Sequence, residues 1–238
     1  MSFADPRLGS DLLWREVRVK RFPRPMPALF LDRDGVMIEE KEYIRNAGAV
    51  ELLPGIAELI QAARSEGMAV VEVTNQAGIA RGYLGWPEFV EVENRVRELL
   101  AQQGTEIDAV FACPFHADGI APYNLPNHPG RKPNPGMLLE AARLLYLDLS
   151  ESVLAGDKAS DLGAARAAGL ACGIHLLTGH GRSEREPSCA LATDSFPVHV
   201  AAGAADAVAF LARAAANRRL GTTAISVGRQ SSEYREKR

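Results

Sequence analysis

The sequence predicts an α/β fold of three layers, in which a central parallel sheet is covered by helices on both faces. Short apolar segments alternate along the chain with segments whose apolar residues recur at helical spacing, and this order is typical of parallel strands joined by helices. The segment 69–73 is apolar except at Glu72, which indicates a strand that is buried on both faces. Polar residues follow several of these segments, and sheets of this kind bind ligands at the carboxyl ends of their strands.

The order of elements follows from these patterns. Strands are expected at 28–31, 69–73, 108–112, 152–155, 171–177 and 198–200. Helices are expected between Gly55 and Gly67, between Pro87 and Gly104, and at 137–145, 160–168 and 204–215, with proline and glycine marking several of the ends. The region 113–135 is irregular, and connections of this length tend to be functional or disordered. Mixed charges and prolines predict a loosely packed arm at 1–25, one domain at 26–216 and a disordered polar tail at 217–238.

The composition excludes several classes of protein. The chain has 238 residues, 47% of them hydrophobic, which suits one sizeable domain. A net charge of −3 gives no sign of a nucleic-acid surface, and no apolar run is long enough to span a membrane. The first 24 residues lack the apolar core of a secretory signal, and three dispersed cysteines are typical of a reducing compartment. We therefore expect a cytoplasmic protein without a nucleic-acid or membrane partner.

Two aspartates one residue apart follow the strand expected at 28–31. Asp32 and Asp34 would point to the same face, and Gly35 allows the turn that leaves them at the end of the sheet. One carboxylate can attack an electrophile while the other moves a proton, with a hard cation reducing their repulsion. Such acidic pairs also occur as helix caps and solvated turns.

Other expected strands and loops bring polar groups to the same edge. Each group has a structural alternative as a helix cap or a solvated charge, but their joint appearance in order favours a binding site. Carboxylates, cations and a hydroxyl beside a glycine-rich turn suit a phosphate and Mg²⁺ rather than zinc. The residues concerned are Thr74, Asn75, Gln76, Arg81, Arg131, Lys132, Asp157 and Asp161.

The order of these groups resembles the four motifs of the haloacid dehalogenase (HAD) superfamily of phosphohydrolases. The similar segments are Asp-Arg-Asp-Gly at 32–35, Val-Thr-Asn at 73–75, Lys132, and Gly-Asp at 156–157 with Asp161. Longer blocks at 74–82 and 131–137 resemble the branch that contains D,D-heptose 1,7-bisphosphate phosphatase and histidinol phosphatase. The resemblance implies a Rossmann-like fold with a minimal cap made of loops.

The resemblance also implies a role for each motif residue. Asp32 would be the nucleophile, and Asp34 would protonate the leaving alcohol and later take a proton from water. Mg²⁺ would be held by Asp32, the Asp34 backbone carbonyl and Asp157. Thr74 would donate a hydrogen bond to phosphate and Lys132 would neutralise charge, whereas Asn75, Gln76, Arg81 and Arg131 would bind the rest of the substrate. Asp161 either supports Lys132 or the metal, or simply caps its helix.

The implied activity is hydrolysis of a small sugar phosphate through an aspartyl phosphate. D-glycero-D-manno-heptose 1,7-bisphosphate, cleaved at position 7, is the expected substrate, and histidinol phosphate or another small metabolite is the alternative. A silent phospholigand-binding protein is disfavoured because Asp32, Asp34, Lys132 and Asp157 are all present. A nucleic-acid 3′-phosphatase is disfavoured by the mild acidity of the chain. We expect a monomer.

One loop does not follow the pattern of this branch, whose members often carry a structural zinc before the third motif. Cys113 keeps its expected place, but Phe115 and His128 replace other ligands, so no zinc is expected; a shifted set of Cys113, His116 and His128 remains an alternative.

Glu72 interrupts a strand that should be buried, where a carboxylate needs a partner or a raised pKa. The segment 39–44 is expected to be a small lid, in which Tyr43 either lines the substrate or packs.

Overall fold

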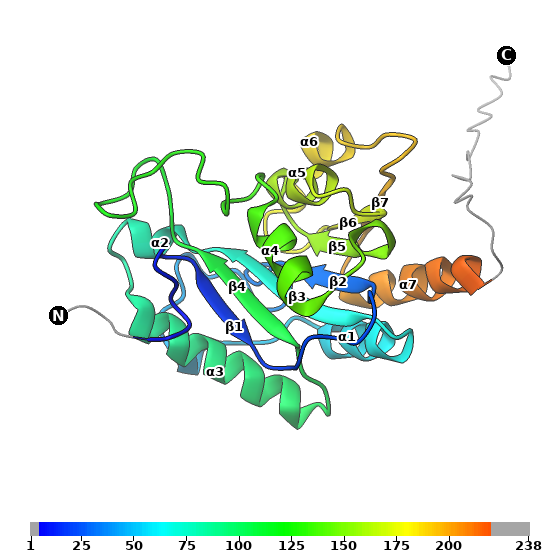
Figure 1. Ribbon diagram of the computed structural model, residues 1–238, viewed down its shortest axis with the longest axis horizontal. Coiled ribbons are helices and arrows are strands. Elements are labelled where there is room, and N and C mark those ends of the chain that lie inside the picture. Colours follow the sequence, from blue (N-terminus) through cyan, green and yellow to red (C-terminus); the bar gives the residue numbers. More distant parts are fainter. Residues whose placement is uncertain (1–4, 220–238) are drawn as a thin grey trace, which may run out of the picture.

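The computed structural model of the protein describes residues 5–219 and contains one seven-stranded sheet (Figure 1). The strand order is β1-β4-β3-β2-β5-β6-β7, and every neighbouring pair is parallel except β1 with β4. This arrangement confirms the predicted α/β class. The strands are β1 (Trp14–Val17), β2 (Ala28–Leu31), β3 (Ala69–Asn75), β4 (Ala109–Cys113), β5 (Val153–Gly156), β6 (Cys172–Leu176) and β7 (Val198–Ala201).

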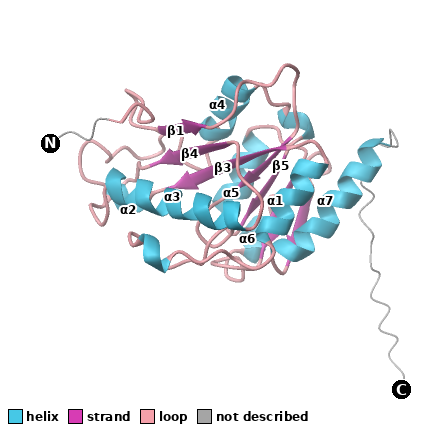
Figure 2. Ribbon diagram, turned by 90° about the horizontal axis from the view of Figure 1, so that it is seen from below, coloured by secondary structure: helices cyan, strands magenta, loops and turns pink. Residues whose placement is uncertain are grey.

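Helices cover both faces of the sheet. One apolar core lies under α1 (Ile56–Ser65), α3 (Trp86–Gln102) and α7 (Ala204–Arg219). The other lies under α4 (Gly136–Leu145) and α5 (Ala159–Ala167), with the short α6 (Arg185–Cys189) packed against α5. Figure 2 shows α4 and α3 on opposite sides of the strands. The three expected layers are therefore present.

The segment expected to be a loosely packed arm belongs in part to the sheet, so this prediction was wrong for β1. Trp14 pairs in register with Ala112 and is fully buried, with its ring stacked on Trp86 at 5.4 Å between centroids. Arg15 and Glu16 stand next to each other between Trp14 and Val17. Charged residues are common on edge strands such as β1, and this pair hid the strand from the sequence pattern.

Loops account for the remaining differences. The segments 32–55 and 114–135 contain no strand, and the three-residue η1 (Ala47–Ala49) is the one helix in them, as expected for a minimal cap of loops. A short α2 (Ala77–Ala80) and a second 3₁₀ segment, η2 (Leu149–Glu151), were not expected. Helix α7 runs through 217–219, which were assigned to the tail, and 220–238 lie outside the described residues. No described helix is both long and apolar enough to cross a membrane.

Candidate active site

Three adjacent strands bring the principal site residues to one edge of the sheet. Strand β2 lies between β3 and β5, and Leu31 is in register with Glu72 on one side and Ala155 on the other (Figure 1). Asp32 therefore leaves the sheet between the polar ends of its two neighbours. The parallel pairing predicted from the sequence is what makes these three ends coincide.

Asp32 is held by a buried lysine. The Lys132 ammonium lies 2.8 Å from Asp32 Oδ1, 2.7 Å from Asp161 Oδ1 and 2.7 Å from the carbonyl oxygen of Val73. Lys132 is 2% exposed, and the two carboxylates raise its pKa although burial acts in the opposite direction. Lys132 is thus a fixed positive charge. Asp161 fulfils both alternatives considered for it, since it supports Lys132 and also caps α5 by accepting from the backbone N–H of Lys158.

Asp32, Asp157 and Asp161 form an acidic cluster whose ligand atoms lie within 4.8 Å of one another, the one such grouping among the described residues. Burial raises the pKa of Asp32 to about 6 and that of Asp157 to about 8, and the charge of Asp32 adds to the effect on Asp157. Asp157 Oδ2 accepts a hydrogen bond from the backbone N–H of His180 at 2.8 Å, but its buried Oδ1 has no partner.

The cluster fits a divalent cation. Asp161 is occupied, because Oδ1 contacts Lys132 and Oδ2 accepts from the backbone N–H of Lys158 at 3.0 Å. Asp32 and Asp157 are left with oxygen atoms for a hard cation, and oxygen ligands suit Mg²⁺. An unpartnered buried carboxylate oxygen is costly unless something binds it.

Two glycines from other parts of the chain, Gly35 and Gly179, pack against the Asp157 side chain and leave no room for a larger residue. A Cβ on Gly35 would lie 2.5 Å from Asp157 Oδ2, and one on Gly179 would lie 2.4 Å from the same atom. Both residues also have positive φ angles, of 83° and 50°. The turn after β2 is fastened further by Thr178, whose hydroxyl donates to the Gly35 carbonyl at 2.6 Å.

The Asp34 carboxylate is fixed from two sides. Arg33 Nη2 donates to Asp34 Oδ2 at 2.9 Å, and Gln76 Nε2 donates to the same oxygen at 2.9 Å. Gln76 Nε2 also lies 2.9 Å from Thr74 Oγ1, so the Gln76 amide links the Asp34 carboxylate to the Thr74 hydroxyl. The sequence predicted Gln76 as a substrate-binding residue, but these contacts make it a bridge within the site.

Asn75 is likewise engaged by the protein. Its amide Nδ2 donates to the Lys132 carbonyl at 3.0 Å, and its Oδ1 accepts from the Lys132 N–H at 3.1 Å. The pair of bonds fastens the loop that carries Lys132 to the end of β3. Whether Asn75 and Gln76 also contact substrate stays a prediction.

Two arginines lie near the edge of the site. Arg81 donates to the hydroxyl of Tyr43 and approaches His116 Nε2 at 3.3 Å, whereas Arg131 donates to the Phe115 carbonyl at 2.9 Å. Burial and the charge of Arg81 lower the pKa of Arg131. A pocket of about 140 Å³ is lined by Arg131, Lys132 and His116 together with Ala117, Pro126, Asn127, Pro133 and Asn134. Positive charge is therefore available beside the acidic cluster.

Three further residues at the site were missed from the sequence. Lys158 Nζ and His180 Nε2 lie 3.5 Å and 3.4 Å from Glu40 Oε2. Asp157 and Asp32 raise the pKa of Lys158 despite its partial burial. Lys158 directly follows Asp157 and Glu40 belongs to the segment 39–44 expected to be a lid, but neither of them was assigned a role from the sequence, and His180 showed no sign of one.

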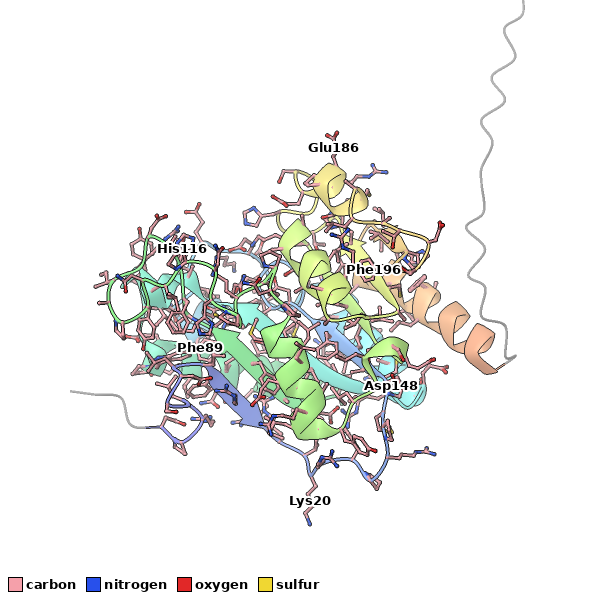
Figure 3. All side chains as sticks on the ribbon, turned by 45° about the horizontal axis from the view of Figure 1, so that its top comes forward. Lys20, Phe89, His116, Asp148, Glu186 and Phe196 are labelled. Atoms are coloured by element: carbon pink, nitrogen blue, oxygen red, sulfur yellow. The ribbon has the colours of Figure 1, made fainter. Side chains whose placement is uncertain are left out.

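The residues considered for zinc serve other contacts. His128 stacks on Phe115 with 4.0 Å between ring centroids, and its Nδ1 accepts from the Gly130 N–H at 3.0 Å. Cys113 Sγ lies 4.0 Å from that nitrogen, whereas His116 Nε2 lies 3.3 Å from Arg81 Nη2. Figure 3 shows His116 on the loop that follows β4. The absence of zinc from this loop stays a prediction.

Comparisons with known proteins identify the family. A family model described as HAD-hydrolase-like matches residues 130–207, which include Lys132 and Asp157. A D-glycero-β-D-manno-heptose-1,7-bisphosphate 7-phosphatase of Mesorhizobium japonicum is 49% identical over 152 residues, 64% of this chain and 70% of that protein. The chain belongs to the HAD-like phosphatase family. A phosphatase of the same name from Vibrio cholerae is 39% identical over 168 residues, 70% of this chain and 89% of that protein.

Solved structures agree with this membership. A Mesorhizobium loti protein described as HAD-like superposes with a TM-score of 0.75 at 38% identity, covering 85% of this chain and 92% of that chain. A D,D-heptose 1,7-bisphosphate phosphatase from B. bronchiseptica, solved with magnesium and phosphate, gives a TM-score of 0.68 at 30% identity and covers 79% and 99% of the two chains. The predicted superfamily, fold and phosphatase class are confirmed.

Proposed function

We propose that this HAD-like phosphatase is Mg²⁺-dependent and removes the 7-phosphate of D-glycero-D-manno-heptose 1,7-bisphosphate through an aspartyl phosphate. The observation that carries the mechanism is the buried Asp32 carboxylate, which lies 2.8 Å from the Lys132 ammonium and beside the unpartnered oxygen of Asp157. The names of the relatives support the substrate.

The first step forms the covalent intermediate. A carboxylate oxygen of Asp32 attacks phosphorus, and the bond between phosphorus and the sugar oxygen breaks. Asp34 gives its proton to the departing oxygen, so the sugar leaves as an alcohol. Lys132 stays charged throughout, and Thr74 lies at the adjacent strand end, where its hydroxyl can donate to a phosphoryl oxygen.

The second step returns Asp32 to its starting state. Asp34, now ionised, takes a proton from a water molecule whose oxygen attacks phosphorus. The bond between phosphorus and the Asp32 oxygen breaks, and inorganic phosphate leaves. The two donors on Asp34 Oδ2 keep this carboxyl group in place for both proton transfers.

The metal site of the proposal uses Asp32, the Asp34 backbone carbonyl and Asp157. Bound Mg²⁺ would offset the repulsion between these carboxylates and the phosphate and hold the transferring group in line. Asp157 contributes the buried oxygen that otherwise lacks a partner. Asp161 is paired with Lys132, so Asp32 and Asp157 are the carboxylates that would hold the cation.

Arg81 and Arg131 support a substrate with a second anionic group. Two guanidinium groups near the edge of the site can bind a phosphate that does not react. The same charges would repel the cationic amine of histidinol phosphate, which is the alternative substrate.

The proposal extends to a cytoplasmic monomer without nucleic-acid or membrane partners, and size-exclusion chromatography tests its oligomeric state.

A panel of phosphates tests the substrate. We expect the largest kcat/KM for a heptose 1,7-bisphosphate, with the α and β anomers assayed separately because relatives of both names match this chain. Arg131→Ala should reduce kcat/KM for the bisphosphate more than for a monophosphate. A larger kcat/KM for histidinol phosphate would overturn the substrate proposal but leave the phosphatase class intact.

A further inference from the structure

A buried charged cluster lies behind Asp34, on the side of the sheet covered by α3. Arg33 is 1% exposed, and its guanidinium group lies between two acids, with Nη2 2.9 Å from Asp34 Oδ2 and Nη1 2.8 Å from Glu93 Oε1. The Arg33 guanidinium carbon also lies 5.5 Å from the centre of the Phe89 ring. Glu93 and Phe89 both belong to α3, so this helix fixes the position of Arg33.

Glu72 is the third acid of this cluster, after Asp34 and Glu93. It is fully buried on β3, and neither of its carboxyl oxygens has a hydrogen-bond partner. Burial raises the pKa of Glu72 well above its ordinary value, and the charge of nearby Glu93 adds to the effect. The guanidinium group of Arg33 donates hydrogen bonds to Glu93 and Asp34 and none to Glu72, so the first two acids share its positive charge.

The contacts with Glu93 and Asp34 fix the orientation of the Arg33 guanidinium group. A guanidinium group is a rigid planar fork, so a carboxylate on one end determines where the other end points. Glu93 holds the Nη1 end, and Arg33 then presents Nε and Nη2 to Asp34 Oδ1 at 3.3 Å and 3.1 Å. Without Glu93, the fork could rotate and Asp34 would keep only Gln76 as an independent restraint.

We propose that Glu93 is a positioning residue for proton transfer, because it acts through Arg33 to hold the Asp34 carboxyl group at the leaving oxygen. The inference rests on the proposed function, in which Asp34 is the general acid. Glu93 is 2% exposed and touches no reacting group, so its effect on the reaction passes through Arg33. General acids lose efficiency when they are displaced from the atom that they protonate.

The dependence of kcat/KM on the leaving group tests this proposal. p-Nitrophenolate departs without a proton, whereas the alkoxide of a sugar phosphate needs one. With Mg²⁺ present, Glu93→Ala should reduce kcat/KM for a sugar phosphate by about tenfold or more. It should reduce kcat/KM for p-nitrophenyl phosphate only slightly. Glu93→Asp is the second variant, for use if Glu93→Ala does not fold. It keeps a carboxylate that is shorter by one methylene, and it should show the same selectivity between the two substrates to a smaller degree.

Asp108 provides a matched control. It is also a buried acid paired with an arginine, since its Oδ1 lies 3.1 Å from Arg64 Nη1, but it precedes β4 at the end of the sheet opposite Asp32. Asp108→Ala should lower stability and leave the ratio of the two kcat/KM values unchanged. Equal losses for both substrates in the Glu93 variants, or no loss for either, would overturn the inference. Wild-type protein that hydrolyses neither substrate would instead overturn the proposed function.

Discussion

Asp157 lies where stability alone would not place a carboxylate. One of its oxygens is buried without a partner, and two glycines are required to make room for the other. Asp32 stands close enough to raise the Asp157 pKa by repulsion, in addition to the effect of burial. Such a concentration of unpaired acid is typical of a functional site that reduces the stability of the fold.

We predict that Asp157→Asn raises the melting temperature of the metal-free protein. The amide removes a buried acid that is strained by its neighbours, while the same substitution removes a ligand of the proposed cation. Mg²⁺ should therefore raise the melting temperature of the wild type but not that of the variant. Thermal unfolding with and without Mg²⁺ measures both effects, and an equal Mg²⁺-induced increase in the two proteins would contradict the assignment of Asp157.

The sequence located residues by type and spacing better than it located their contacts. Asp32, Lys132 and Asp157 could be predicted because each follows a strand or a recognisable motif, and the structure brings them together. The use of Gln76 could not be predicted, because its neighbours Thr74 and Asn75 offer similar polar groups and only the fold selects a partner. The contact of Glu40 with Lys158 and His180 joins residues that are more than a hundred positions apart, so local spacing carries no sign of it.

At the scale of elements, β1 shows the limit of pattern reading. Its four residues are Trp, Arg, Glu and Val, and the two charges resemble those of an exposed segment. Pairing with β4 and the stacking of Trp14 on Trp86 depend on parts of the chain that lie far away in sequence. Long apolar strands such as β3 were easier to predict, because burial on both faces leaves a continuous signal.

We predict that Trp14→Ala lowers the free energy of unfolding by about 3–5 kcal/mol, because a fully buried aromatic side chain leaves a large cavity. Urea denaturation followed by circular dichroism measures the change. A loss below about 1 kcal/mol would mean that β1 contributes little to the domain. Val17→Ala is the matched control on the same strand, since Val17 is 40% exposed, and it should change stability much less.

Glu72 on β3 should make the free energy of unfolding depend on pH. Because the pKa of Glu72 in the folded protein lies well above 4.5, the unfolded chain loses this proton first as the pH rises. The free energy of unfolding should therefore fall by about 1.4 kcal/mol per pH unit between the unfolded and folded pKa values.

We predict that Glu72→Gln removes this contribution. The variant should match the wild type most closely near pH 4.5, and it should exceed the wild type in stability by a margin that grows as the pH rises towards the pKa of Glu72 in the folded protein. Urea denaturation of both proteins at several pH values measures the difference. A margin that is independent of pH would show that Glu72 is already ionised in the folded protein.

At the scale of the whole molecule, the parallel sheet explains why the site exists. Alternating strands and helices place all carboxyl ends on one edge, and the order β3-β2-β5 puts Asp32 between Thr74 and Asp157. The class of fold could be predicted because this alternation is regular. The loops 32–55 and 114–135 could not, because their conformations depend on contacts such as those of Arg81 with Tyr43 and of His128 with Phe115.

The most direct test is phosphate release from a sugar phosphate by the metal-stripped protein, with and without added Mg²⁺, in the wild type and in Asp32→Asn. We predict that turnover by the wild type requires Mg²⁺ and that Asp32→Asn, which cannot form the aspartyl phosphate, shows no turnover under either condition. Undiminished turnover by Asp32→Asn, or wild-type turnover that does not respond to the metal, would contradict the account.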